Sequence, residues 1–209
     1  MVGAVAQTVH SVAATPVRCP LFQSIIERFD EERRFVVCDL GPARCGTVSL
    51  FEPFRCRLEI LSLPDLLPAL QACESVSEAE ALVRDRVPAT ANEPIDALLC
   101  WNLLNYLSPE LIGAVIGAVA ERLAPGGFAH ALIEYSSTRM PARPGLIAPN
   151  GANQLLIVPD QGESRPSPRY SLAALERCLS GLKSERSMLL GNGMQEYLFR
   201  RPATATGDQ

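Results

Sequence analysis

Three short apolar runs stand out in the pattern of hydrophobic and polar positions. The run over 35–39 is FVVCD, the run over 95–100 is IDALLC, and the run over 128–134 is FAHALIE. Mostly apolar runs of this length are typical of strands buried on both faces of a parallel sheet. We therefore predict that these three segments are parallel neighbours in one sheet, with a further strand over 57–63.

Helical periodicity fills the segments between the predicted strands. Apolar residues recur at helical spacing over 21–29, 66–72 and 76–87. The clearest helix starts at Ser108, a favourable N-cap, with Pro109 at the first helical position. Its apolar face continues to Leu123, and Pro125-Gly126-Gly127 is expected to end it. Strand, helix and strand in this order predict a right-handed crossover in a parallel sheet.

The C-terminal third changes character. Residues 136–169 are rich in Pro, Gly and Asn, so we predict a long irregular loop with a short strand over 153–159. A helix should follow from Ser171 to Leu179. The segments 185–190 and 194–200 flank an Asn-Gly pair, which predicts an antiparallel hairpin. The expected fold class is α/β: a doubly wound, mostly parallel sheet that ends in an antiparallel hairpin.

Composition and length limit the number of domains, the partners and the cellular compartment that we expect. The 209 residues suit one domain over 18–201, with a disordered tail over 1–17 and a second tail over 202–209. A net charge of −4 without a basic stripe makes no nucleic-acid partner evident. No apolar run approaches ~20 residues, so no membrane span is expected. Seven cysteines without a C-x-x-C motif favour reduced thiols in the cytoplasm and no metal site.

Three segments resemble class I S-adenosylmethionine-dependent methyltransferases. The segment 37–41, VCDLG, is similar to the family's first strand and the start of its glycine loop. The segment 94–107 has the family's aspartate, apolar strand and short polar loop, and 123–128, LAPGGF, resembles its "leucine, any residue, Pro-Gly-Gly" turn. The resemblance spans about 35–134, and the hairpin extends it. It implies a Rossmann-like methyltransferase fold and S-adenosylmethionine as cofactor.

The glycine loop departs from the family pattern, which is an acidic residue followed by glycines at every second position. One alignment places Asp39, Gly41, Ala43 and Cys45 at those positions, so that two glycines are replaced. A second alignment treats 42–44 as an insertion and resumes at Cys45-Gly46. Both alignments stay open. In either one, Pro42 removes a backbone donor from the loop.

The resemblance also implies roles for individual residues. Asp39 would accept a hydrogen bond from the cofactor's amino group, Asp65 would bind the ribose, and Trp101 and Asn102 would lie beside the adenine or the substrate. Each has a structural alternative: Asp39 or Asp65 as an acid near a helix N-terminus, and Trp101 as a core residue. Catalytic residues are not identified. Tyr106 falls where several small-molecule methyltransferases carry a histidine base, whereas His130 is expected to be structural.

Two functions follow from these observations. The first is methyl transfer from S-adenosylmethionine to a small molecule or a protein, in which positioning carries most of the catalysis. The second is a pseudoenzyme: the fold persists without catalysis and acts as a partner-binding module through the 136–169 segment and the hairpin. Neither the methyl acceptor nor the oligomeric state follows from the sequence.

Overall fold

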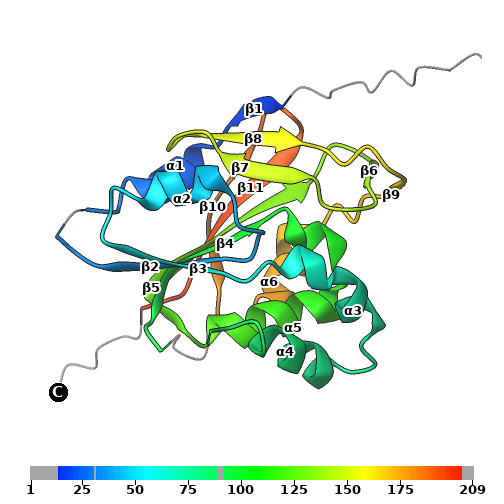
Figure 1. The fold of residues 1–209 in the computed structure, drawn as a ribbon. Coiled ribbons are helices and arrows are strands. Elements are labelled where there is room, and N and C mark those ends of the chain that lie inside the picture. Colours follow the sequence, from blue (N-terminus) through cyan, green and yellow to red (C-terminus); the bar gives the residue numbers. More distant parts are fainter. Residues whose placement is uncertain (1–13, 31, 89–91, 204–209) are drawn as a thin grey trace, which may run out of the picture.

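A computed structural model describes residues 14–30, 32–88 and 92–203, which form an α/β domain around a six-stranded sheet (Figure 1). The strand order is β10-β11-β5-β4-β2-β3. The strands are β2 (Phe35–Asp39), β3 (Cys56–Ile60), β4 (Ile95–Trp101), β5 (Leu123–Glu134), β10 (Lys183–Leu189) and β11 (Met194–Arg200). β3, β2, β4 and β5 are parallel, and β11 joins β5 antiparallel. The predicted parallel neighbours and the final hairpin are confirmed.

Helices cover both faces of this sheet. α3 (Leu67–Ala72), α4 (Val76–Arg84), α5 (Pro109–Ala120) and α6 (Leu172–Cys178) lie on one face, and α1 (Pro20–Ile26) and α2 (Cys45–Phe51) lie on the other (Figure 1). Alternating residues of β2 serve the two cores: Val36 and Cys38 pack toward α5, and Phe35 and Val37 pack toward α1. This burial on both faces explains why the strand has no polar alternation.

The turn after α5 differs from the expectation. α5 begins as predicted, because the Ser108 hydroxyl accepts a hydrogen bond from the amide of Leu111. It ends at Ala120, however, and Pro125-Gly126-Gly127 lies within β5 instead of terminating the helix. Gly126 has a φ of +80°, and the pairing register with β4 shifts here, so the turn acts as an irregularity at the start of the strand.

The prediction of an irregular loop over 136–169 is wrong outside the short strand. The segment forms β6 (Arg139–Pro141), β7 (Leu146–Pro149), β8 (Gln154–Val158) and β9 (Ser164–Pro166). β6 pairs with β9, and β7 and β8 form a small sheet with β1 (Thr15–Arg18) in the order β1-β8-β7. The prolines lie in β1, β6, β7 and β9, where they are tolerated because these strands are short and lie at edges.

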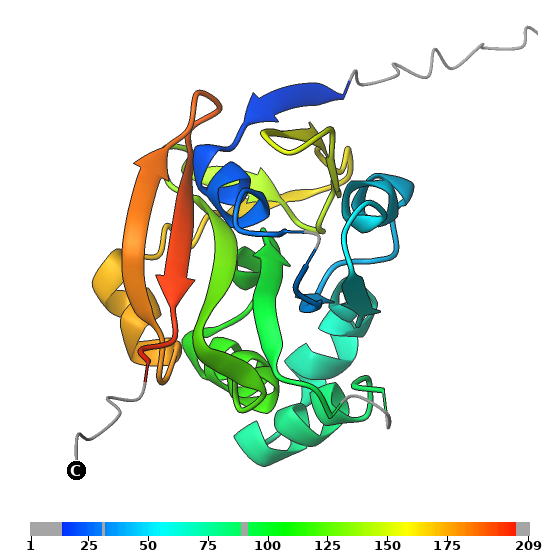
Figure 2. The ribbon, with the colours of Figure 1, turned by 90° about the vertical axis from the view of Figure 1, so that its left-hand side faces the viewer.

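The small sheet also corrects the N-terminal boundary. Residues 15–17 of the predicted tail pair with β8, so the domain begins before residue 18. The rest of that tail up to residue 13 and the end of the chain from 204 lie outside the described residues. β1 and its neighbours stand above the end of the main sheet at which β4 and β5 finish (Figure 2).

His130 has the structural role expected for it. It is fully buried in β5, and its Nε2 lies 2.9 Å from Oε1 of the buried Glu196 in β11. The Glu196 carboxylate also accepts hydrogen bonds from the amides of Leu21 and Phe22, at the start of α1. This carboxylate therefore fixes α1 to the sheet.

Across residues 14–203, the masked positions apart, no helix is long and apolar enough to cross a membrane.

Candidate functional site

The strand order directs attention to the carboxyl ends of β2, β3 and β4. The chain moves from β2 to β3 on one side and then returns to β4 on the other side of β2. Ligands of open α/β sheets bind outside the carboxyl ends of the strands at such a reversal. This edge has two halves. We call Asp39, Gly41 and Trp101 the closed half, and we call the cleft lined by Arg44, Asp65 and Arg143, among others, the open half.

Asp39 ends β2 as a core residue. Its side chain is buried, with only 1% of the residue exposed. Oδ1 accepts hydrogen bonds from the Gly41 amide at 2.7 Å and from Trp101 Nε1 at 2.5 Å. Oδ2 is also buried and has no hydrogen-bond partner among the described residues. Burial raises the pKa of Asp39 from 3.8 to about 6, although interactions with Trp101, Gly41, Thr47 and Arg44 act in the opposite direction.

Trp101 covers Asp39 and Gly41 in the closed half. It ends β4 with a φ of +48°, in the left-handed region that L residues rarely adopt. Its ring packs on Phe22 of α1, with centroids 5.6 Å apart. It also covers Gly41, because a Cβ added there would lie 2.8 Å from Trp101 Cδ1. The indole therefore occupies the side of Gly41 on which a side chain would stand.

The rest of the glycine loop is covered by the small sheet. Gly46 lies in the first turn of α2, and a Cβ added there would lie 2.5 Å from the carbonyl oxygen of Pro149 in β7. Ala43 and Cys45 are exposed and contribute no side chain to the closed half. The backbone of β7 thus lies directly against the start of α2.

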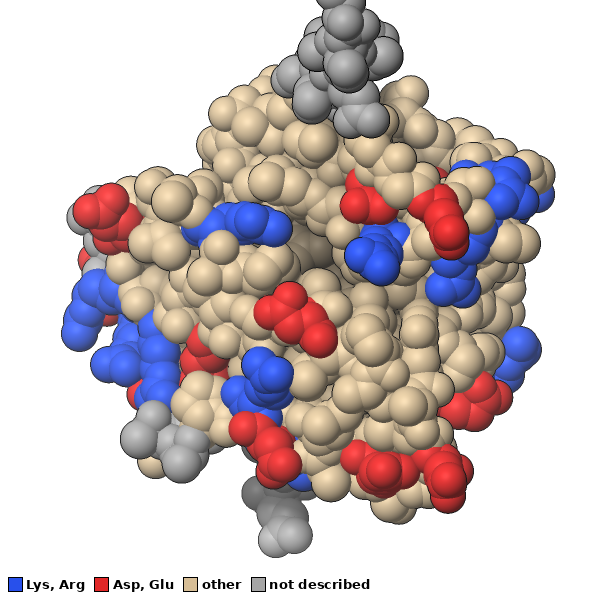
Figure 3. All heavy atoms as spheres, turned by 45° about the vertical axis from the view of Figure 1, so that its right-hand side comes forward, with Lys and Arg blue, Asp and Glu red and all other residues tan. Residues whose placement is uncertain are grey.

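The open half is a cleft of about 620 Å³. Its walls come from the loop after β2, from the 3-10 turn η1 (Leu63–Leu66) with α3, from Tyr106, and from the β6–β7 loop. The lining residues are Pro42, Arg44, Pro64, Asp65, Leu67, Pro68, Gln71, Tyr106, Ala142, Arg143, Pro144 and Gly145. One face of the molecule is visibly hollowed, with basic side chains on two sides of the hollow and acidic ones nearby (Figure 3).

The structure thus separates the residues that the sequence grouped together. Asp39, Gly41 and Trp101 meet in the closed half, whereas Asp65 is exposed and lines the cleft. Asn102 lines neither, because it lies at the start of the 3-10 turn η2 (Leu103–Tyr106), where its carbonyl accepts a hydrogen bond from Asn105 Nδ2. The cleft does not include any residue of the closed half.

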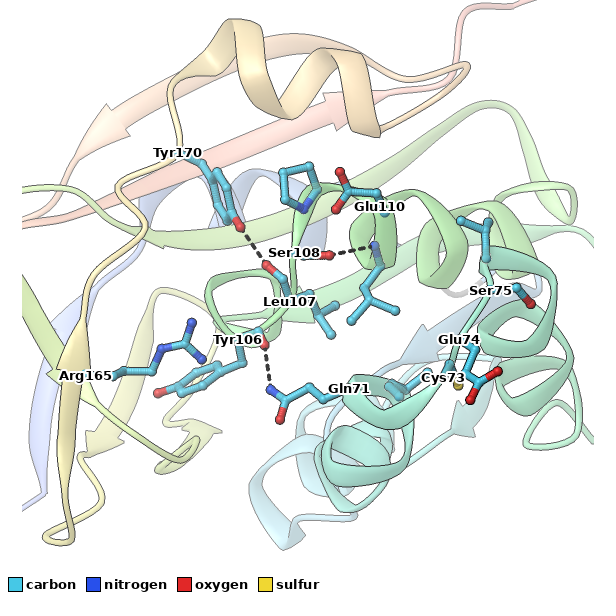
Figure 4. A pocket seen from close by; sticks show the side chains of 14 residues that line it. Gln71, Cys73, Glu74, Ser75, Tyr106, Leu107, Ser108, Glu110, Arg165 and Tyr170 are labelled. Atoms are coloured by element: carbon cyan, nitrogen blue, oxygen red, sulfur yellow. Dashed lines mark hydrogen bonds between the residues drawn. The ribbon is translucent and has the colours of Figure 1, made fainter.

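Tyr106 and Gln71 line both the cleft and a second hollow of about 680 Å³ on the helical side, which Figure 4 shows. The Tyr106 hydroxyl donates a hydrogen bond to the carbonyl of Arg143, and the Tyr106 carbonyl accepts one from Gln71. Burial raises the pKa of the Tyr106 hydroxyl well above its ordinary value of 10. This tyrosine is therefore a poor general base near neutral pH. In the second hollow, the Arg165 guanidinium lies beside the Tyr106 ring (Figure 4).

Sequence reasoning missed the two cationic residues of the cleft. The second alignment of the glycine loop makes Arg44 part of an insertion, but its Nε is buried without a hydrogen-bond partner among the described residues. Arg143 lies in the segment Pro141-Ala142-Arg143-Pro144, between two prolines that fix the backbone on either side. An arginine held in such a rigid segment is the signal that would have found it.

Comparison with known proteins gives structural likeness alone. No protein-family model matches the chain, and no curated protein matches it. Among solved structures, a 1,6-didemethyltoxoflavin-N1-methyltransferase of Burkholderia thailandensis is 18% identical, with a TM-score of 0.47 over 81% of this chain and 72% of that one. CalS10, an amino pentose methyltransferase of Micromonospora echinaspora, is 16% identical, with a TM-score of 0.45 over 87% of both chains.

A third similar structure is the glycopeptide N-methyltransferase MtfA complexed with S-adenosylmethionine. It is 16% identical, with a TM-score of 0.46 over 88% of this chain and 87% of that one. The chain is structurally similar to class I S-adenosylmethionine-dependent methyltransferases over most of its length. At these identities and TM-scores, the likeness carries no conclusion about ligand or reaction.

Proposed function

We propose that this chain is a binding module with a methyltransferase-like fold, and that it does not hold S-adenosylmethionine in the position implied by the resemblance. The observation that supports this is the contact of Trp101 with Asp39 and Gly41. The carboxylate expected to receive the cofactor's amino group already accepts the indole Nε1–H at 2.5 Å. It is also sealed in the core, with 1% exposure.

The backbone of the loop gives the same argument. A glycine loop binds a ligand because bare glycines let the ligand approach the backbone closely. Here the indole of Trp101 covers Gly41, and the carbonyl of Pro149 covers Gly46. These residues do not fit the cofactor at this position, so we derive no methyl-transfer step through it.

Titration calorimetry with S-adenosylmethionine and with S-adenosylhomocysteine tests this proposal. Trp101 is the only tryptophan in the chain, so its fluorescence reports on the closed half alone. We expect no saturable heat at millimolar ligand and no change in tryptophan emission. Adenosine is the matched control, because it lacks the methionine portion. Saturable binding of S-adenosylmethionine by the parent, accompanied by a change in emission, would overturn the proposal.

Methyl transfer to a small molecule or a protein is the second candidate. It is favoured by one observation: Asp39 Oδ2 is a buried acceptor that no described residue satisfies, and such atoms ordinarily have a partner. On this reading Trp101 moves aside and Asp39 receives the cofactor's amino group. Binding by the parent that is lost in Asp39→Asn would support this candidate over the first.

A further inference from the structure

The open half has a rigid and largely apolar wall. Four prolines line the cleft, at positions 42, 64, 68 and 144, together with Leu67. Proline fixes its own φ and has no backbone N–H, so these positions supply shape but no hydrogen-bond donor. A preformed wall lowers the conformational cost of binding a ligand. Polar recognition in this cleft must therefore come mainly from side chains.

Two polar side chains of the cleft already have hydrogen-bond partners within the domain. Gln71 donates to the carbonyl of Tyr106, and the Tyr106 hydroxyl donates to the carbonyl of Arg143. The guanidinium of Arg143 makes no hydrogen bond or ion pair within the part of the chain that the structure describes, although Arg143 also lines a smaller hollow with Asp160 and Glu163. Arg44 interacts electrostatically with Asp39, but its buried Nε has no acceptor there. Two guanidinium groups are thus the available donors.

We propose that this cleft binds a small molecule with a planar or apolar body and one carboxylate or phosphate group, which Arg44 and Arg143 hold. Guanidinium groups suit these anions because they donate two parallel hydrogen bonds to them. The body of the ligand packs on the prolines and Leu67. Asp65 disfavours a second anionic group at its side of the cleft and accepts a hydrogen bond from a hydroxyl or amino group.

The second hollow does not offer the same chemistry. There Arg165 is accompanied by Glu74 and Glu110, so the lining has no excess of positive charge. The anion site is therefore assigned to the cleft on the other side of Tyr106. This inference rests on the proposed function, in that it names the ligand class that the module takes in its open half.

The experiment uses three probes of similar size: phenyl phosphate, benzoate and the neutral benzyl alcohol. Titration calorimetry on the full chain should give saturable binding for at least one anion and none for the alcohol. The tighter anion identifies whether the natural ligand carries phosphate or carboxylate. Binding should weaken at 0.5 M NaCl, because added salt screens the arginines (the screening length is ~10 Å at 0.1 M). Anions that bind no better than benzyl alcohol overturn the proposal.

Three variants locate the site. Arg44→Gln and Arg143→Gln should each weaken anion binding by about tenfold, as expected for loss of a charge-assisted hydrogen bond. Arg186→Gln is the matched control, since Arg186 is exposed on β10, at the opposite edge of the sheet. Thermal unfolding checks that each variant folds. Because Arg143 belongs to the β6–β7 loop and not to α2, its variant stays informative if Arg44→Gln disturbs the start of that helix.

Equal anion affinity in the parent and in Arg143→Gln overturns the assignment of the cleft. The two proposals fail in different ways. Failure of the proposed function appears as S-adenosylmethionine binding with altered tryptophan emission. Failure of the anion site appears as the loss of any difference between the anions and benzyl alcohol, in the absence of S-adenosylmethionine.

Discussion

The two halves of the carboxyl edge differ in how their polar groups are satisfied. In the closed half, Asp39 accepts from Gly41 and Trp101 and is sealed from solvent. In the open half, Arg44 and Arg143 face a cleft of about 620 Å³ without hydrogen-bond acceptors from the described chain. The strand reversal thus has two neighbouring positions: the closed half, which side chains fill, and the open half, which is free for a ligand.

The reason for the difference lies in which residues follow each strand. β4 ends in Trp101, a large side chain whose Nε1–H needs an acceptor when buried, and Asp39 at the end of the adjacent β2 supplies it. The loops that line the cleft instead carry prolines and arginines, which neither fill the space nor pair with each other. One aromatic residue is therefore enough to close one half.

Replacing Trp101 should have the largest effect, because it empties the closed half. We expect Trp101→Ala to lower the free energy of unfolding by about 3–5 kcal/mol, as for other large-to-small core changes. Urea denaturation followed by circular dichroism measures it. Tyr135→Ala is the control: Tyr135 is 46% exposed and its loss should stay within ~0.5 kcal/mol. A loss under ~1 kcal/mol at Trp101 would mean that its ring is not packed as described.

The second prediction concerns the pH dependence of the closed half. The pKa of Asp39 rises from 3.8 to about 6 on folding, so the folded state holds this proton more tightly than the unfolded chain. The stability it contributes is complete below about pH 4 and is lost as the pH rises through 6. Asp39→Asn has no proton to lose. Relative to the parent, it should gain about 2 kcal/mol between pH 4 and 7.5.

Urea denaturation of parent and variant across this pH range provides the measurement. The decisive observation is the sign of the change in the free energy of unfolding, since removing a buried carboxylate is expected to stabilise the domain at neutral pH. A difference between the two proteins that does not change with pH would show that Asp39 is not a buried, titrating carboxyl.

A smaller change in stability should distinguish Gly46, which lies against the Pro149 carbonyl, from Gly113, which has no such close neighbour. Gly→Ala inside a helix ordinarily stabilises by up to about 1 kcal/mol. In Gly46→Ala the new Cβ would lie 2.5 Å from the Pro149 oxygen, so β7 must shift, at a cost of about 1–3 kcal/mol. Gly113→Ala in α5 is the matched control, because the nearest atom to its Cβ would be 3.7 Å away. Thermal unfolding should therefore show a lower Tm for Gly46→Ala and a higher Tm for Gly113→Ala. Shifts of Tm in the same direction would contradict the contact between β7 and Gly46.

The main sheet could be predicted because its signal is local. β2 and β4 are mostly apolar runs, and burial on both faces favours that composition. In the small sheet only β8 left such a signal, as the short strand predicted over 153–159. β7 is brief and ends in Pro149, and the small sheet is stabilised by the pairing of β8 with β1 and by the contact of β7 with α2. Pairing between segments so distant in the chain does not appear in a window of sequence.

The candidate site was predictable only in its location. The sequence brought Asp39, Gly41 and Trp101 to one edge, because the ends of neighbouring parallel strands must lie together. The indole could stack on a ligand or donate a hydrogen bond to Asp39, and the choice depends on the backbone at Trp101. Its positive φ cannot be predicted from the residue type. The cationic cleft depends on the β6–β7 loop, which lies in the segment that the sequence predicts to be irregular.

The pairing of β1 with β8 has a consequence for the order of events during synthesis. Thr15 lies opposite Ile157, so β1 cannot pair with β8 until most of the domain has left the ribosome. Closing so long a loop is entropically costly and slows folding. The main sheet can assemble strand by strand up to β5, whereas the small sheet over the glycine loop must close later. A nascent chain therefore passes through a stage in which the start of α2 is still uncovered.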